Sequence, residues 1–168
     1  MSFSMYNAST PVFKQILGSL SAIIDKAQAH ATEKKIDADA LLQARLFPDM
    51  FPFARQVQIA CDFAKGAAAR LGGVEVPKYD DTETSFADLQ ERIAKTLAFI
   101  ASVPQDGIEA SAARDITTGS GDKAKQWKGQ TYLVHYALPQ FYFHATTAYN
   151  ILRHNGVEIG KKDFVGSF

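Results

Sequence analysis

The residue with the clearest chemical capacity is His144, which lies within the stretch ALPQFYFHATTAYNILRHNG at residues 137–156. Apolar residues in this stretch recur at the period of a helix, and on that helix His144 borders the apolar stripe rather than the polar face. A histidine in this position can act as a metal ligand or a general base, because imidazole does both near neutral pH. The alternative is a neutral core histidine that hydrogen-bonds a neighbouring helix, because buried polar groups need partners.

The spacing of the other metal-binding residues disfavours a histidine-rich metal centre. A catalytic site of the zinc type needs about three protein ligands. The position one helical turn after His144 is Ala148, and His154 lies roughly 15 Å further along the helix axis. Carboxylates offer another route, although Asp49 could instead pair with Arg45 or cap the following helix. The candidate ligands on this reading share an expected place near the second and last helices: His144, Asp49, Asp62 and His135.

A small-molecule site is the interpretation that the residue types favour. The second long helix has no histidine but is rich in amide side chains, and we expect its first turn to face His144. Tyrosines near the start of the last helix would supply a wall, because aromatic rings carry large apolar surfaces with one polar tip. The candidate ligand-binding residues are therefore His144, Gln56, Arg55, Tyr136 and Tyr142.

Composition excludes several classes of function. The 168 residues include 18 Lys and Arg against 18 Asp and Glu, so the balanced chain lacks the electrostatic footprint of a nucleic-acid-binding protein. No apolar run approaches the roughly 18 residues that span a bilayer, and the opening MSFSMYNAST does not resemble a signal peptide. The single cysteine, Cys61, excludes an internal disulfide framework and falls on an apolar helix face. We expect a soluble, cytoplasmic protein that binds neither nucleic acid nor membrane.

Four long segments have the apolar periodicity of amphipathic helices. Their ends carry residues typical of helix termini, including a possible capping box, glycine pairs and prolines. The predicted helices run from Thr10 to the lysine pair at 34–35, from Phe53 to Gly72–Gly73, from Ser85 to Pro104, and from near Pro139 to Asn155–Gly156. A short helix from Asp39 through Leu46 is predicted before the second of them.

A small β-hairpin is predicted between the third and fourth long helices. The segment DITTGSGDKAKQWKG at 115–129 has two short runs around a Gly-Ser-Gly turn. The chain has no repeat and no linker long enough to divide it, so residues 1–168 are expected to form one domain. Four amphipathic helices with one long crossover predict an all-α four-helix bundle with this hairpin in the crossover.

Two long motifs carry a resemblance to a known family. The stretches RLFPDMFPFARQVQIACDFAKGAAARL and ALPQFYFHATTAYNILRHNGVEIGKKDF resemble an uncharacterised bacterial domain-of-unknown-function family of the DinB/YfiT-like superfamily. This resemblance implies a DinB-like four-helix bundle that is often dimeric. It also implies a divalent metal held by three histidines in many members, and thiol-transferase or metal-dependent hydrolase activity in some.

Only part of the superfamily's metal motif is present. The motif has one histidine on the second helix and an H-x-x-x-H pair on the last. His144 matches one position of the pair, but Ala148 stands at the other. On the second helix, Arg55, Gln56 or Gln58 stands where a histidine would be expected. The sequence therefore predicts a degenerate metal site.

Three hypotheses follow for function. The first is small-molecule binding in a cleft between the second and last long helices near His144, with no cofactor. The second is a divergent metal-dependent enzyme, which the ligand count disfavours. The third is a structural or interaction homodimer without catalysis, joined through the face of the last helix that carries Tyr142, Thr146 and Arg153.

Overall fold

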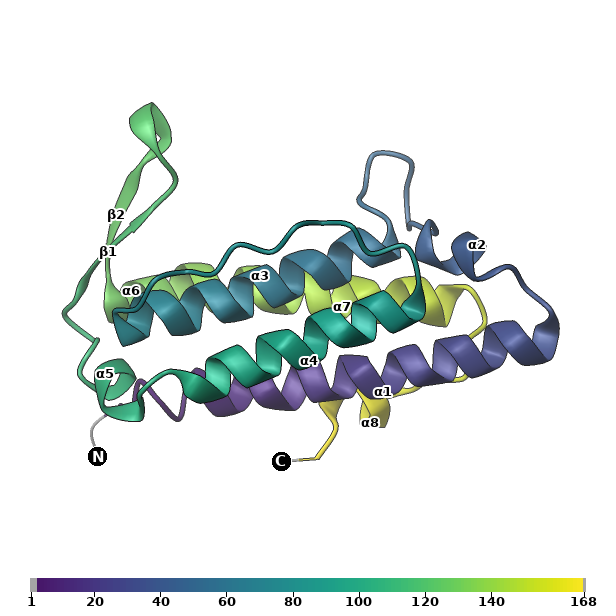
Figure 1. Cartoon of the computed structure of the whole chain (residues 1–168), viewed down its shortest axis with the longest axis horizontal. Helices are drawn as coiled ribbons and strands as arrows, with labels where there is room; N and C mark the ends of the chain where they lie inside the picture. Colours follow the sequence, from purple (N-terminus) through teal and green to yellow (C-terminus); the bar gives the residue numbers. More distant parts are fainter. Residues whose placement is uncertain (1–2, 168) are drawn as a thin grey trace.

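Four long helices lie side by side in the computed structural model, which describes residues 3–167 (Figure 1). They are α1 (Thr10–Lys34), α3 (Phe53–Gly72), α4 (Phe86–Ser102) and α7 (Leu138–His154). α3 packs most extensively against α7 and also against α4, while α1 packs against α4. The predicted all-α four-helix bundle is confirmed.

Short elements connect the long helices. The helical ones are α2 (Ala38–Leu42), α5 (Gln105–Glu109), η1 (Gly121–Lys123), α6 (Gly129–Tyr132), the π-helical η2 (Leu133–Ala137) and α8 (Lys161–Val165). The strands β1 (Asp115–Thr118) and β2 (Lys125–Lys128) pair antiparallel, with Asp115 opposite Lys128. They form the predicted hairpin in the crossover, which projects away from one end of the bundle (Figure 1).

The helix termini follow from local chemistry. The Ser85 side chain accepts from the backbone N–H of Asp88, whose carboxylate accepts in return from the N–H of Ser85, so the predicted capping box is present. α2 begins earlier than predicted because Asp37, rather than Asp39, is its N-cap. The Asp37 carboxylate accepts from the N–H of Asp39 at 3.0 Å.

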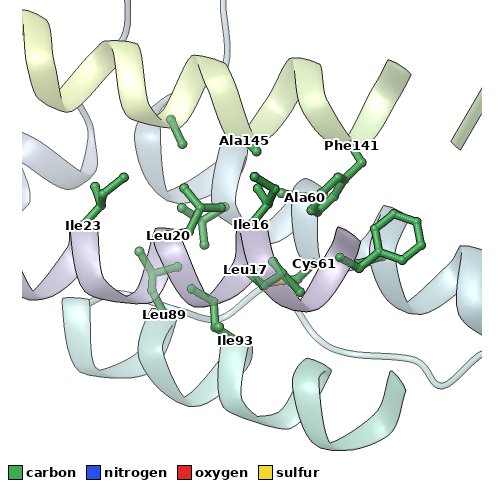
Figure 2. Packing of buried hydrophobic residues seen from close by; sticks show 14 of the residues in the cluster. Ile16, Leu17, Leu20, Ile23, Ala60, Cys61, Leu89, Ile93, Phe141 and Ala145 are labelled. Carbon is green, nitrogen blue, oxygen red and sulfur yellow. The ribbon is translucent and has the colours of Figure 1, made fainter. Parts of the chain in front are cut away.

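The core lies between the four helices and includes helix faces that carry small side chains (Figure 2). α3 contributes fully buried alanines at positions 60, 64, 67 and 68. α7 contributes the fully buried Ala145 and Ala148. Small side chains let two helix backbones approach closely, and the closely packed α3–α7 pair carries the candidate site. No helix within residues 3–167 is long and apolar enough to cross a membrane.

Cys61 is fully buried in this core, as predicted, so its thiol is shielded from solvent and from reagents in solution (Figure 2). Burial raises its pKa to about 12, although a hydrogen bond with Thr96 and the charge of Arg92 oppose the shift. Only the thiolate attacks disulfide reagents.

We therefore expect no reaction of the native protein with Ellman's reagent at about pH 8, and one reactive thiol per chain after unfolding in guanidinium chloride. Rapid release of colour from the folded protein would contradict this packing.

Candidate functional site

His144 of α7 is joined to Gln56 of α3 by a buried hydrogen bond. The His144 Nδ1 and Gln56 Oε1 atoms lie 2.7 Å apart. Gln56 Nε2 donates to the carbonyl of Phe51 at 3.0 Å, which fixes the amide so that Oε1 faces the ring. Oε1 can only accept, so Nδ1 carries the proton and Nε2 keeps a free lone pair. Gln56 lies across from His144 as expected, and their contact is also the hydrogen bond to a neighbouring helix that the core-histidine alternative describes.

Two aromatic rings hold the imidazole in place. Phe63 stacks on His144 with ring centroids 5.9 Å apart and planes 13° apart. Phe143 presents its edge, with centroids 5.2 Å apart and planes at 88°. His144 is therefore only 8% exposed and its orientation is restrained on both sides.

The environment keeps His144 neutral. Burial lowers the pKa of its imidazole, and the positive charge of Arg55 lowers that pKa further. A neutral imidazole at physiological pH can accept a hydrogen bond through Nε2. Within residues 3–167, no group forms a hydrogen bond with Nε2. Nε2 is also not one of the atoms there that lack a partner and are completely shielded from solvent. Nε2 is therefore free to accept a hydrogen bond.

A cleft of about 400 Å³ lies beside the ring. Its walls come from the loop before α3, the first turn of α3 and the first half of α7. The lining residues are Asp49, Met50, Phe51, Gln56, Gln140, Phe143 and His144. Clefts of this size, mostly apolar with a few polar groups, are typical of small-molecule sites.

The loop that forms the outer wall of the cleft is held by its own arginine. Arg45 Nη1 donates to the carbonyls of Pro48 and Met50, at 3.5 and 3.3 Å. Asp49 therefore does not pair with Arg45, and the N-cap of α3 is Pro52 rather than Asp49. The Asp49 side chain remains exposed at the rim of the cleft.

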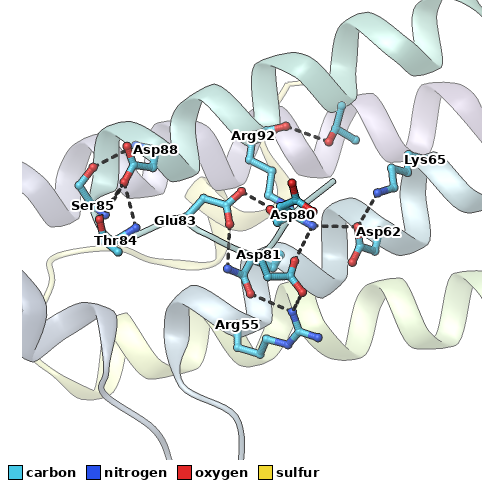
Figure 3. Close-up of polar contacts among 12 residues, drawn as sticks. Arg55, Asp62, Lys65, Asp80, Asp81, Glu83, Thr84, Ser85, Asp88 and Arg92 are labelled. Atoms are coloured by element: carbon cyan, nitrogen blue, oxygen red, sulfur yellow. Dashed lines mark hydrogen bonds and ion pairs between the residues drawn. The ribbon is translucent and has the colours of Figure 1, made fainter. Parts of the chain in front are cut away.

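Arg55 and Asp62, two candidate residues, belong to a different polar cluster (Figure 3). Arg55 pairs with Asp81 and donates to Gln58 at 3.0 Å. It was predicted to line the His144 cleft, but it is not among the residues that line it. Asp62 Oδ1 pairs with Arg92 at 2.9 Å and with Lys65 at 2.8 Å.

This second cluster is centred on Arg92 and holds the segment that connects α3 to α4, residues 74–85, in place. Arg92 is 3% exposed and pairs with Glu83 at 2.8 Å and with Asp81 at 3.0 Å, besides Asp62. The acidic partners 81 and 83 lie in residues 74–85, which cross over α3 to the start of α4 (Figures 1 and 3). Sequence reasoning missed the cluster because this irregular segment has no periodicity that would place its acids beside a particular helix.

The remaining candidates also lie outside the His144 cleft. Tyr136 packs on Trp127, with ring centroids 5.1 Å apart, and lines a separate pocket. Tyr142 is 38% exposed and contacts Phe141, so it forms no wall of the cleft. His135 is exposed on η2. These placements correct the prediction that Tyr136, Tyr142 and Arg55 line the cleft.

The metal set suggested by the sequence is not assembled. Of its four members, only His144 and Asp49 line one cleft. Within residues 3–167 no group of three His, Cys, Asp or Glu side chains could hold a metal ion. Ala148 is fully buried, and Gln56 faces His144 from α3. The residues present therefore do not fit the three-histidine site that the DinB-like resemblance implies.

The fold and this site define a DinB-like helical bundle whose last helix presents a single histidine to a cleft. The chain belongs to the family described as Domain of unknown function (DUF1993), which matches residues 5–165. It is also similar to the crystal structure of a DinB family member protein from Shewanella denitrificans. The two share 44% identity over 97% of this chain and 92% of that chain, with a TM-score of 0.91. No curated protein matches the chain.

The buried imidazole makes stability depend on pH. Because the His144 pKa is lowered on folding, the unfolded chain takes up the proton first as pH falls through about 6.5. We expect the free energy of unfolding to fall below that pH, and to fall less steeply in His144→Leu, which has no proton to take up. Urea unfolding curves from pH 8 to 5 measure this difference.

A control variant comes from the partner side chain. Gln56→Glu places a carboxylate at Nδ1 and should raise the His144 pKa, because a negative charge stabilises imidazolium. The histidine proton resonances report this shift, with the exposed His154 as an internal reference. Equal pH slopes in wild type and His144→Leu would contradict the assignment.

Proposed function

We propose that this protein binds a small molecule in the cleft between α3 and α7, using His144 as a neutral hydrogen-bond acceptor. The observation that carries the proposal is the contact chain from the Phe51 carbonyl through Gln56 to His144 Nδ1. It leaves Nε2 as the free nitrogen of a ring that lines the cleft, and it fixes the orientation of that ring before a ligand binds. Preorganised polar groups of this kind give a ligand site its specificity.

The chemistry of the walls defines the ligand class. Phe51 and Phe143 line the cleft and are 54% and 56% exposed, which suits an apolar or aromatic ligand body. The Asp49 carboxylate at the rim and Nε2 of His144 are both acceptors, so the ligand should carry an N–H or O–H donor. Within this proposal the protein acts in the cytoplasm on a small molecule rather than on nucleic acid.

Three simple aromatic molecules test the proposal. Phenol and benzylamine each carry a donor on an aromatic body, whereas toluene has the body alone. We expect phenol and benzylamine to bind more tightly than toluene by about threefold to tenfold, the worth of one neutral hydrogen bond. Ligand-observed NMR or the shift in Tm measures this preference.

The matched variants are two histidine replacements on the same helix. His144→Leu should abolish the preference for phenol over toluene, and His154→Leu should keep it, because His154 is exposed at the C-terminal end of α7. The proposal is wrong if the wild type binds none of the three, or if the preference survives in His144→Leu.

A homodimer is a second proposal, favoured by exposed side chains on one face of α7. Tyr142 is 38% exposed, and Thr146 and Arg153 are also exposed there. We expect sedimentation velocity at micromolar concentration to give a dimer, and Thr146→Arg to give a monomer, since like charges would then meet across a two-fold contact. A monomeric wild type would rule out this interface.

A further inference from the structure

A second pocket lies against the hairpin end of α3, separate from the His144 cleft. It measures about 180 Å³ and is lined by residues of α3, of the start of the hairpin turn and of the α6–η2 junction. Its polar members are Arg70, Tyr132 and Thr118, and its apolar wall includes Phe63 and Tyr136.

Arg70 brings a positive charge to this pocket without an acidic partner. Within residues 3–167 its guanidinium forms no salt bridge, and its one side-chain hydrogen bond goes to the Tyr132 hydroxyl at 3.3 Å. A partly buried guanidinium normally pairs with a carboxylate, so this one has donors left for a ligand.

Gly66 makes room for the guanidinium. A Cβ atom at position 66 would lie 2.6 Å from Arg70 Nη1, one helical turn away. Arg70 therefore folds back along α3 over the glycine. Any side chain at position 66 would displace it.

Two hydroxyl groups are oriented as further donors. The Tyr132 hydroxyl accepts from Arg70, and the Thr118 hydroxyl accepts from Trp127 Nε1 at 2.9 Å. Each oxygen accepts from a fixed N–H, so each O–H proton is free to point elsewhere. Tyr132 and Thr118 are 1% and 8% exposed, and burial raises the pKa of Tyr132, so its hydroxyl stays protonated at neutral pH.

The backbone beside these groups includes the π-helical turn η2. Tyr132 directly precedes the π-helical turn and Tyr136 lies within it, with their ring centroids 5.9 Å apart. Single π turns inside helices occur frequently at functional sites. The one carboxylate of the pocket, Asp62, is already paired with Lys65 and Arg92, so its charge is offset (Figure 3).

From these contacts we propose that the pocket binds the oxyanion group of a small molecule, a carboxylate or a phosphate, through Arg70, Tyr132 and Thr118. The guanidinium supplies the charge and the two hydroxyls supply additional donors. Phe63 and Tyr136 would contact the apolar part of a carboxylic acid. The proposal does not depend on the His144 cleft, because none of its three donor residues lines that cleft.

Trp127 reports directly on this pocket, because it is the single tryptophan of the chain and contacts both Thr118 and Tyr136. The full-length protein is titrated with sodium butyrate and, separately, sodium phosphate, at constant ionic strength and about pH 7.5. We expect a saturable change in fluorescence with at least one of them. Saturation by butyrate alone assigns a carboxylate with an apolar tail, and saturation by phosphate alone assigns a phosphate group.

Four variants separate the site from general charge effects. Arg70→Gln and Tyr132→Phe should weaken binding by about tenfold or more, the worth of a charged hydrogen bond. Gly66→Ala should also weaken it, although the variant keeps the charge and favours helix formation. Lys161→Gln removes one positive charge from an exposed position on α8, away from the pocket, and should leave affinity unchanged.

Isothermal titration calorimetry of the same pairs detects binding that leaves the fluorescence of Trp127 unaltered. The proposal is overturned if neither anion binds the wild type by either method. It is also overturned if Arg70→Gln and Gly66→Ala bind as the wild type does, or if Lys161→Gln loses as much affinity as Arg70→Gln. Circular dichroism of each variant establishes that it is folded before its affinity is compared.

Discussion

The close packing of α3 against α7 is the constraint on which both candidate sites depend. Buried alanines on the two helices keep the side chains between them small (Figure 2). The hydrogen bond from His144 to Gln56 is consequently direct, at 2.7 Å, rather than bridged by a longer side chain or a water. Gly66 lies on a different side of α3, where its missing side chain accommodates the Arg70 guanidinium. A larger residue at any of these positions would cost packing energy and would also move a polar group.

Charge is distributed unevenly around α3. The charged groups near the crossover segment 74–85 pair with one another, and Arg92 alone contacts three carboxylates. Removing Glu83, which is 10% exposed, would leave the buried Arg92 charge less well compensated. By contrast, Asp62 and Asp81 are 36% and 38% exposed, and solvent screens their contribution. The cluster therefore serves to hold the crossover in place. It also ties up Arg55 and Asp62, so the His144 cleft keeps neutral polar groups and one exposed carboxylate at its rim.

Local and periodic features of the sequence were sufficient to predict the bundle. Ser85 and Asp88 cap α4 as expected, and helix faces alone gave the expectation that Gln56 of α3 lies across from His144. The candidate residues that do not line the His144 cleft depend on features that helical periodicity does not describe. Arg55 faces an acid in an irregular crossover, which periodicity does not describe. Tyr136 lies within the π-helical turn η2, where side chains do not take the directions that a regular α-helix predicts.

Phe63 links the two sites physically while their chemistry keeps them distinct. Its ring stacks on His144 at one side and meets the edge of Tyr136 at the other, with centroids 5.9 Å apart in both pairs. On the His144 side the lining includes two acceptors, Nε2 and the Asp49 carboxylate, and the Gln140 amide, which can donate or accept. On the Arg70 side they are donors, a guanidinium and two hydroxyls. Hydrogen-bonding groups distinguish ligands of similar size, so ligands of the two clefts would have to differ in the groups that they offer. Ala148 stands where the resemblance implies the second histidine of the metal motif, and the two clefts beside α3 are lined instead by different sets of polar groups.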